Sequence, residues 1–165
     1  MSEDGTPIEP GGAIAFRPAN VVDLDTIVAL KLRMFQDANL STRLAADAKQ
    51  LIFATYSRLY ADQLAAHFIA VADRKIVAMA GAFIKSDLPY CFFHNPNYGF
   101  IGDVYTRPEW RRKGLARQLS QEAIQWLRTQ GIGEVHLLAS EHGRSLYQAL
   151  GFLPSDERVL RLGPD

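Results

Sequence analysis

The spacing of apolar residues in the first part of the chain predicts one short strand followed by helices. The segment AIAFRPA (13–19) is typical of a strand that ends at Pro18. Asn20 can cap the helix that follows, and Asp23 falls in its first turn. A second helical stretch, in one or two pieces, runs roughly over 42–66. The helical spacing rests on Val21, Leu24, Val28, Leu32 and Phe35, then on Leu44, Ala48, Leu51, Thr55 and Leu59.

The middle and last parts of the chain alternate between strand and helix patterns. Two apolar runs in 67–84 flank DRK and predict a hairpin. A loop rich in aromatic residues (85–99) leads to a strand at 100–106, and Arg107 is biased toward extended geometry because Pro108 follows it. A helix over about 115–130 ends at Gly131, a buried strand is expected at 134–140, and Ser140 can cap a helix that ends at Gly151. The segment 157–162 alternates as a last strand.

The order of these elements is β, α, α, β, β, β, α, β, α, β. Hairpins mixed with crossovers predict an α/β (α+β) fold with a mixed, mostly antiparallel central sheet flanked by helices. We expect a flexible tail at 1–12, which is acidic and rich in Gly and Pro, and a single domain over 13–165.

Composition narrows the function classes. The 165 residues carry a formal net charge of zero, so a general attraction to nucleic acid or to a membrane surface is not expected. The only cysteine is Cys91, which excludes an intrachain disulfide, and there is no signal-peptide pattern and no apolar run long enough to cross a bilayer. These features favour a cytoplasmic protein without a nucleic-acid or membrane partner.

Several common motifs are missing. The chain lacks GxxxxGK[ST] and GxSxG, and GIGEVH (131–136) precedes a strand and has no third glycine, so it is not a dinucleotide fingerprint. Cys91 and His94 are spaced as CxxH, but no second pair follows at zinc spacing, so we expect no metal.

The segment RRKGLA (111–116) carries the main chemical signal. Three cations precede Gly114 where a strand gives way to a helix. The first turn of a helix leaves backbone N–H groups unpaired and positive, and a glycine lets an anion approach the backbone closely. Cations at a helix start are mildly unfavourable unless an anion is bound, so the segment predicts a phosphate or pyrophosphate site. A solvated basic turn is the alternative.

Two motifs resemble signatures of the GNAT acetyltransferase superfamily. Residues 111–116 match [QR]-x-x-G-x-[GA], the acetyl-CoA-binding motif of that family, and LYQALGF (146–152) is similar to its second signature. The order of elements over roughly 13–162 is also similar. The resemblance implies an N-acetyltransferase that moves an acetyl group from acetyl-CoA to a primary amine of a small molecule or peptide. A homodimer is common among similar proteins.

The resemblance also implies roles for individual residues. Tyr147 would be the general acid, because a phenol with a pKa of about 10 stays protonated at neutral pH and can donate to a departing thiolate of pKa about 8.5. The backbone of Val104 and Tyr105 would serve the pantetheine arm and the thioester carbonyl. The remaining cofactor-binding set at the loop and helix start is Arg111, Arg112, Lys113, Gly114, Leu115 and Ala116, to which we add Ser140.

The residue that accepts the amine proton stays open. Many family members place a glutamate on the strand before the loop, where this chain has Gly102. Asp103 is adjacent but is expected to point to the opposite face of the sheet. His94, Glu109 and His142 are other candidates, as is water. Asp37, near the end of the first helix, could attract a cationic amine. The absent glutamate also leaves a second hypothesis, a domain that binds acyl-CoA as a sensor without turnover.

Overall fold

One five-stranded sheet organises the protein, whose computed structural model describes residues 13–87 and 95–156. Its strands lie in the order β1-β2-β3-β4-β5. The first four are antiparallel neighbours, whereas β5 runs parallel to β4. The mixed, mostly antiparallel sheet predicted from the sequence is therefore confirmed. The strands are β1 (Ala15–Pro18), β2 (Ala65–Ala72), β3 (Lys75–Ser86), β4 (Asn97–Thr106) and β5 (Val135–Leu137).

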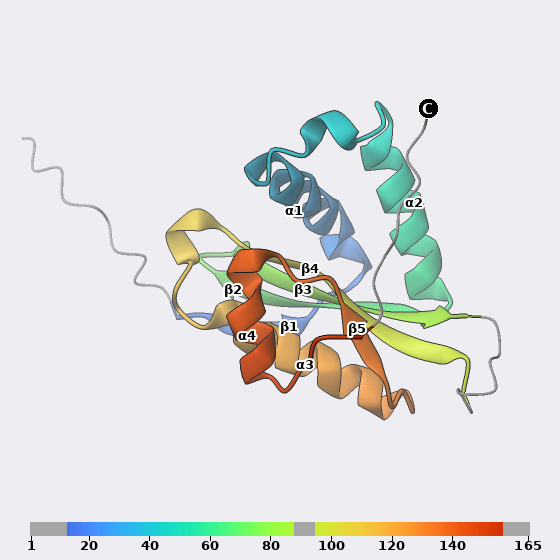
Figure 1. The fold of residues 1–165 in the computed structure, drawn as a ribbon. Helices are drawn as coiled ribbons and strands as arrows, with labels where there is room; N and C mark the ends of the chain where they lie inside the picture. Colours follow the sequence, from blue (N-terminus) through green and yellow to red (C-terminus); the bar gives the residue numbers. More distant parts are fainter. Residues whose placement is uncertain (1–12, 88–94, 157–165) are drawn as a thin grey trace, which may run out of the picture.

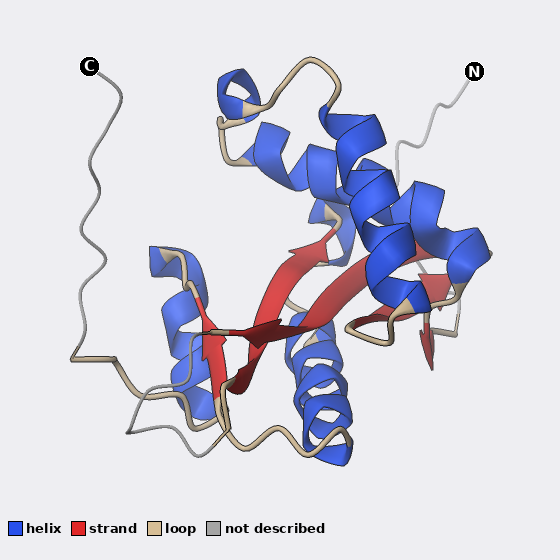
Figure 2. Cartoon of the chain, turned by 90° about the vertical axis from the view of Figure 1, so that its right-hand side faces the viewer, coloured by secondary structure: helices blue, strands red, loops and turns tan. Residues whose placement is uncertain are grey.

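Helices cover both faces of the sheet (Figures 1 and 2). On one face lie α1 (Leu24–Asp37) and α2 (Ala48–Ala61), and on the other lie α3 (Leu115–Thr129) and α4 (Arg144–Ala149). The predicted stretch 42–66 is indeed two pieces, the short helix η2 (Ser41–Arg43) and α2. Three other short helices are η1 (Val21–Asp23), η3 (Pro108–Trp110) and η4 (Glu141–Gly143). None of the helices in the described part of the chain is long and apolar enough to cross a membrane.

Two apolar layers hold the helices to the sheet. On the α3 face, Leu119, Ala123 and Leu127 are fully buried against the sheet. On the α1 face, Ile27 and Val28 are fully buried in a second cluster. Strand β4 serves both layers, because successive side chains of a strand point to opposite faces. Residues of β4 therefore contribute side chains both to the α3 face and to the α1 face.

The structure corrects the bounds predicted for one loop and one strand. The expected loop at 85–99 is shorter, because β3 continues to Ser86 and β4 begins at Asn97. The strand expected at 134–140 is only Val135–Leu137 and is partly exposed, since its one strand neighbour within the described residues is β4. The predicted last strand, 157–162, lies outside the described residues.

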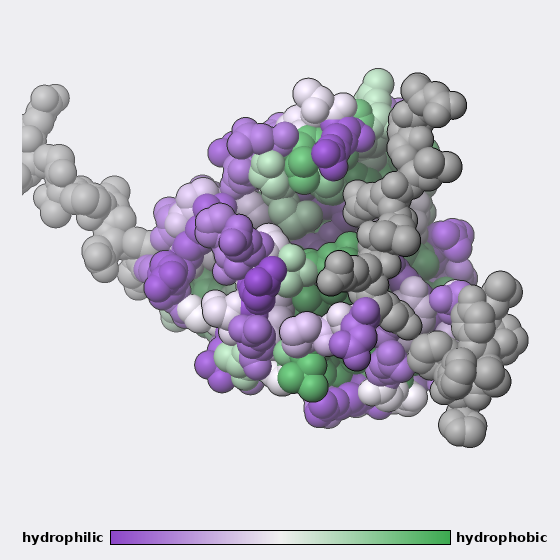
Figure 3. Space-filling view, viewed as in Figure 1, coloured by the Kyte–Doolittle hydropathy of each residue, from purple (hydrophilic) through white to green (hydrophobic). Residues whose placement is uncertain are grey.

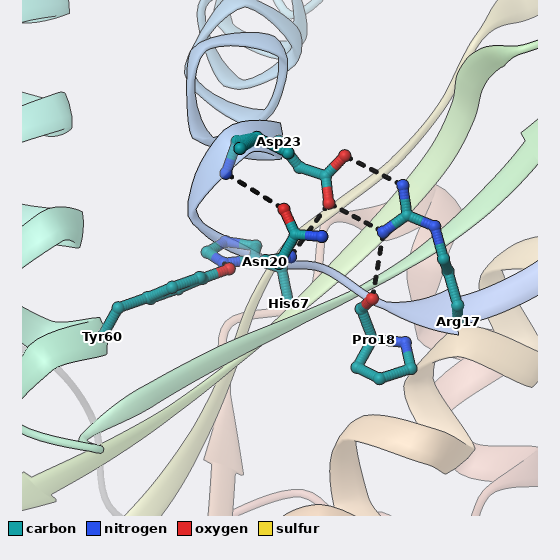
Figure 4. A network of polar contacts seen from close by, with 7 residues as sticks. Arg17, Pro18, Asn20, Asp23, Tyr60 and His67 are labelled. Carbon is teal, nitrogen blue, oxygen red and sulfur yellow. Dashed lines mark hydrogen bonds and ion pairs between the residues drawn. The ribbon is translucent and has the colours of Figure 1, made fainter.

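The start of the first helical segment is capped as the sequence predicts (Figure 4). The Asn20 side chain accepts a hydrogen bond from the Val22 N–H at 3.0 Å, and the Asp23 carboxylate accepts one from the Asn20 N–H at 2.9 Å. Arg17 on β1 holds the same carboxylate with two bonds of 2.7 and 2.9 Å. The arrangement is a capping box tied to the edge of the sheet.

Replacing Asn20 with alanine is expected to lower the free energy of unfolding by about 1 kcal/mol, because the cap to Val22 is lost. Urea unfolding measures the change. Gln50→Ala, at an exposed position of α2, is the control and should change the free energy by less than about 0.5 kcal/mol. Equal effects of the two substitutions would show that the cap contributes nothing.

Candidate active site

The loop before α3 has a backbone suited to holding an anion. Arg112 and Gly114 both have left-handed backbones, with φ of 64° and 77°. The first bond within α3 runs from the Gln118 N–H to the Gly114 carbonyl at 3.1 Å. The amides of residues 115–117 therefore precede the hydrogen-bond ladder of a 15-residue helix. A Cβ on Gly114 would meet no atom within 4 Å, so the space in front of the loop is open.

The side chains of this loop are less uniform than the sequence suggests. Arg111 turns back: its guanidinium donates to the Thr106 carbonyl and to Asp37 on α1, each at 3.0 Å. The Lys113 ammonium lies 5.1 Å from the centre of the Trp110 ring. Of the rest of the predicted set, Arg112 is exposed, Leu115 is buried in the core under α3, and Ala116 is partly buried. Backbone amides, with Arg112 and Lys113 beside them, remain for an anion.

A groove lies between the later turns of α3 and the end of α4. Its volume is about 320 Å³. The lining residues, which come from both helices, are Gln121, Ile124, Gln125, Arg128, Ala149 and Leu150. None of these residues belongs to the loop before α3.

Tyr147 on α4 lines a second and larger groove of about 1150 Å³, along β5 and the outer part of β4. In the space-filling view the molecule is hollowed between the layer of α1 and α2 and the layer of α3 and α4 (Figure 3). The Tyr147 ring packs edge-on against Phe152, with centroids 6.0 Å apart. Burial raises the pKa of Tyr147 above its ordinary value. Its hydroxyl has no protein hydrogen-bond partner among the described residues, so the proton is available to a ligand.

Ser140 occupies a capping position. Its hydroxyl accepts a hydrogen bond from the Gly143 N–H at 3.2 Å, which fixes the start of η4 just before α4. Gly143 in turn lies under the Tyr147 ring, since a Cβ there would be 3.2 Å from it. In this structure Ser140 thus supports the segment that carries Tyr147.

The predicted direction of Asp103 is wrong, and the reason is a β-bulge. Gly81 of β3 pairs with Gly102, but Met79 pairs with Tyr105, so β4 has one residue more than β3 over this stretch. Asp103 has a left-handed backbone, with φ of 54°. The extra residue breaks the alternation of the strand and brings the Asp103 side chain to the α1 face, beneath α1 and α2.

Three donors surround the Asp103 carboxylate. Lys31 of α1 binds Oδ1, Tyr56 of α2 binds Oδ2, and the His67 Nε2 lies 3.0 Å from Oδ2. His67 is fully buried, and the Asp103 side chain is 3% exposed. Burial alone raises the pKa of Asp103, but the hydrogen bond from His67 and the charge of Lys31 outweigh it and hold this pKa below its ordinary value. The carboxylate is thus an ionised, fully engaged group and a poor proton acceptor.

The imidazole of His67 reaches Asp103 across an intervening strand. His67 on β2 pairs with Gly81 on β3, which pairs with Gly102 on β4. A Cβ on Gly81 would lie 2.9 Å from the His67 Nε2, so the glycine makes room for the ring. The second ring nitrogen lies 2.9 Å from the Tyr60 hydroxyl (Figure 4). Lys31, Tyr56 and His67 are not predicted as site residues from the sequence; the one available signal is a histidine inside the apolar run AAHFIAVA.

Asp37 is not available to attract an amine in this structure. Its carboxylate accepts hydrogen bonds from the Tyr105 hydroxyl at 2.8 Å and from Arg33 and Arg111 at 3.0 Å each. These contacts, that of Tyr105 foremost, lower the pKa of Asp37. The end of α1 is thereby tied to β4 and to the loop before α3.

The other proton-acceptor candidates are separate from the Asp103 cluster, which consists of Asp103 and its partners Lys31, Tyr56 and His67. Glu109 and His142 are exposed, and His94 lies outside the described residues. At Gly102, a Cβ would come within 3.2 Å of the Phe100 ring and 3.4 Å of the Phe83 ring. The position at which the family resemblance predicts a glutamate is thus filled by aromatic rings.

The predicted thioester-binding segment lies where β4 and β5 part. Their pairing covers Gly99 to Ile101 and stops there within the described residues. Val104 packs toward the core on the α3 face, and Tyr105 toward the core on the α1 face. On the side of β5, the backbone of β4 beyond Ile101 has no strand partner among the described residues.

Comparison with known proteins gives one consistent family. The acetyltransferase (GNAT) family matches residues 32–152. An aminoglycoside N(6')-acetyltransferase type 1 of Salmonella typhimurium is 32% identical over 105 residues, which are 62% of this chain and 70% of that protein.

Solved structures share the fold. A predicted acetyltransferase of Clostridium acetobutylicum, solved with acetyl-CoA, has a TM-score of 0.83 and 24% identity and covers 92% of this chain and 96% of its own. An aminoglycoside N-acetyltransferase solved in complex with CoA has a TM-score of 0.73 and 20% identity, with coverage of 93% and 96%. The family match extends over both motifs and the helices and strands between them, and this chain therefore belongs to the GNAT family of acetyltransferases.

Proposed function

We propose that this acetyl-CoA-dependent N-acetyltransferase acts on a primary amine of a small molecule or peptide by direct attack, with Tyr147 as general acid. The observation that carries the proposal is the left-handed Gly114 at the start of α3, with open space before it and free amides behind it. Such a helix start binds anions, which suits the pyrophosphate of acetyl-CoA.

The reaction has three requirements that the site addresses in different ways. Amine and thioester must be held together, and the groove along β5 and the outer part of β4, which Tyr147 lines, is the place we propose for them. The negative charge that develops on the carbonyl oxygen must be stabilised, and the backbone of β4 at Val104, beyond the last β4–β5 pair at Ile101, suits that role. The departing thiolate must gain a proton, for which the free Tyr147 hydroxyl is suited.

The amine must also lose a proton, and we assign this step to water. Asp103 holds its negative charge against three donors, so a proton on it would disrupt those contacts. Gly102 offers no carboxylate. We therefore propose that water in the hollow between the helix layers takes the proton.

The acceptor panel should begin with amino sugars. Two curated relatives, from Salmonella typhimurium and Salmonella enteritidis, are named as aminoglycoside N(6')-acetyltransferases. Polyamines, amino acids and peptides complete the panel. CoA-thiol release with one amine class supports turnover and identifies the acceptor class. Acetyl-CoA binding without CoA-thiol release in the presence of any amine would favour the sensor hypothesis.

We further propose that the protein is a cytoplasmic homodimer. Light scattering tests the oligomeric state, and cell fractionation tests the location.

Replacing Gly114 with alanine is expected to weaken acetyl-CoA binding about tenfold, because a side chain disfavours φ of 77° by about 1–2 kcal/mol and crowds the anion. Calorimetry measures the Kd. Gly131→Ala is a matched control, since Gly131 also has φ of 77° and open space around its Cβ but ends α3 at the far side. It should lose similar stability and keep its affinity. If both variants bind acetyl-CoA as the wild type does, the loop is not the anion site.

A further inference from the structure

The Asp103 cluster raises a question that the proposed reaction leaves open. Asp103 and His67 are buried and the Lys31 side chain is 21% exposed, yet none of these ionisable residues has a step in the reaction. Burying an ion pair is costly, and pairs of this kind contribute little to stability compared with apolar packing. The contacts therefore point to a role other than stability alone.

The position of the cluster indicates that role. Asp103 is the bulge residue itself, and a left-handed backbone is unfavourable for a residue with a side chain. The bulge comes two residues after the last β4–β5 pair, at Ile101, and immediately before Val104 and Tyr105. Bulges redirect the backbone and end strand pairing beside active sites. The direction in which the next amides point thus depends on the shape held at Asp103.

The donors fix that shape from three different elements. Lys31 reaches Asp103 from α1, Tyr56 from α2 and His67 from β2. Because the carboxylate has contacts with all three elements, it cannot turn without breaking several contacts at once. Two residues further along, the Tyr105 hydroxyl is fixed to Asp37 of α1 at 2.8 Å. The segment between these two anchors is Val104 and the backbone of Tyr105.

We propose that Asp103 is a positioning residue for acetyl transfer: its carboxylate, held by Lys31, Tyr56 and His67, keeps the β4 bulge in the shape that presents the backbone of Val104 and Tyr105 to the thioester. The inference rests on the proposed function, because it needs acetyl-CoA to lie beside this part of β4. It assigns to the cluster an effect on kcat that is separate from binding at the loop before α3.

The main test is Asp103→Asn, since asparagine tolerates a left-handed backbone but carries no charge for Lys31. We expect kcat to fall about 10- to 100-fold, because small misplacements of positioning groups have effects of this size. The Kd of acetyl-CoA should stay within about threefold, because the anion loop lies elsewhere. An unchanged kcat, or a loss confined to Kd, would overturn the inference.

Tyr56→Phe and Tyr60→Phe form a milder pair in case Asp103→Asn does not fold. Both tyrosines are on α2, one helical turn apart. The Tyr56 hydroxyl contacts Asp103, whereas that of Tyr60 contacts His67 only. We expect Tyr56→Phe to lower kcat at least threefold more than Tyr60→Phe does. Equal effects on kcat would contradict a role of the Asp103 contacts.

A binding measurement separates this inference from the proposed function. In wild-type protein labelled with ¹⁵N, acetyl-CoA should shift the amide signals of Val104 and Tyr105 and those of residues 114–116. In Asp103→Asn, the shifts at 114–116 should persist and those at Val104 and Tyr105 should shrink. Full shifts at all positions would overturn the positioning role alone. No shift at any position in the wild type would overturn the proposed site and the inference with it.

Discussion

Replacing Tyr147 with phenylalanine is expected to lower kcat about 100-fold or more, because general acid catalysis contributes effects of this size. The ring contacts with Phe152 and Gly143 need no hydroxyl, so α4 should keep its place. Burial raises the pKa of the Tyr147 phenol, and the wild-type side chain is therefore protonated throughout the neutral range. The substitution removes the proton that the departing thiolate would take.

The measurement is CoA-thiol release under saturating amine and acetyl-CoA, with calorimetry for affinity. The Kd of acetyl-CoA should change by less than about twofold, because the anion site is at the start of α3. Tyr98→Phe is the control: Tyr98 lines the same groove and stacks on His136 through its ring, with centroids 4.8 Å apart. If Tyr147→Phe turns over at the wild-type rate, another group protonates the thiolate.

Replacing Lys31 with methionine is expected to lower the free energy of unfolding by about 3 kcal/mol at neutral pH, because it leaves the Asp103 carboxylate buried without its cation. The low end of the usual range applies, since the Lys31 side chain is 21% exposed. Arg58→Met is the control. Arg58 pairs with Asp62 on the exposed side of α2, and loss of such a pair costs about 0.5 kcal/mol or less.

The effect of Lys31→Met should depend on pH. In the wild type, the folded-state pKa of Asp103 lies below its unfolded value of about 3.9. The carboxylate therefore contributes stability above about pH 4, and this contribution is lost as the pH falls through the folded-state pKa. Without Lys31 that pKa rises, so the difference between variant and wild type should narrow below about pH 4. Denaturant titrations at several pH values test this. A difference that does not vary with pH would mean that Lys31 acts through packing alone.

The sequence predicts the local elements of this protein well because each depends on neighbouring residues. Helical spacing identifies α1 and α3, the DRK turn identifies the β2–β3 hairpin, and the cap at Asn20 follows from its side chain. The anion loop is also local, since a helix start and a glycine in one short segment suffice to predict it.

The Asp103 cluster could not be predicted in the same way. Its members are separated by up to 72 positions in the chain, and their contacts depend on strand register. A single extra residue on β4 reverses which face Asp103 occupies, and no pattern of apolar residues marks it. The same holds for Asp37, whose partners Tyr105 and Arg111 come from the other half of the chain.

The aromatic rings around Gly102 have a consequence for enzyme engineering. A designer who wishes to add a proton acceptor would choose Gly102→Glu, but the new Cβ would lie 3.2 Å from Phe100 and 3.4 Å from Phe83. The Phe83 and His67 rings also pack edge to face, with centroids 5.5 Å apart. A base at this position therefore requires coordinated replacement of the rings, in which the His67 contact to Asp103 is kept. Single-site libraries at position 102 would sample only side chains that the present positions of Phe83 and Phe100 allow.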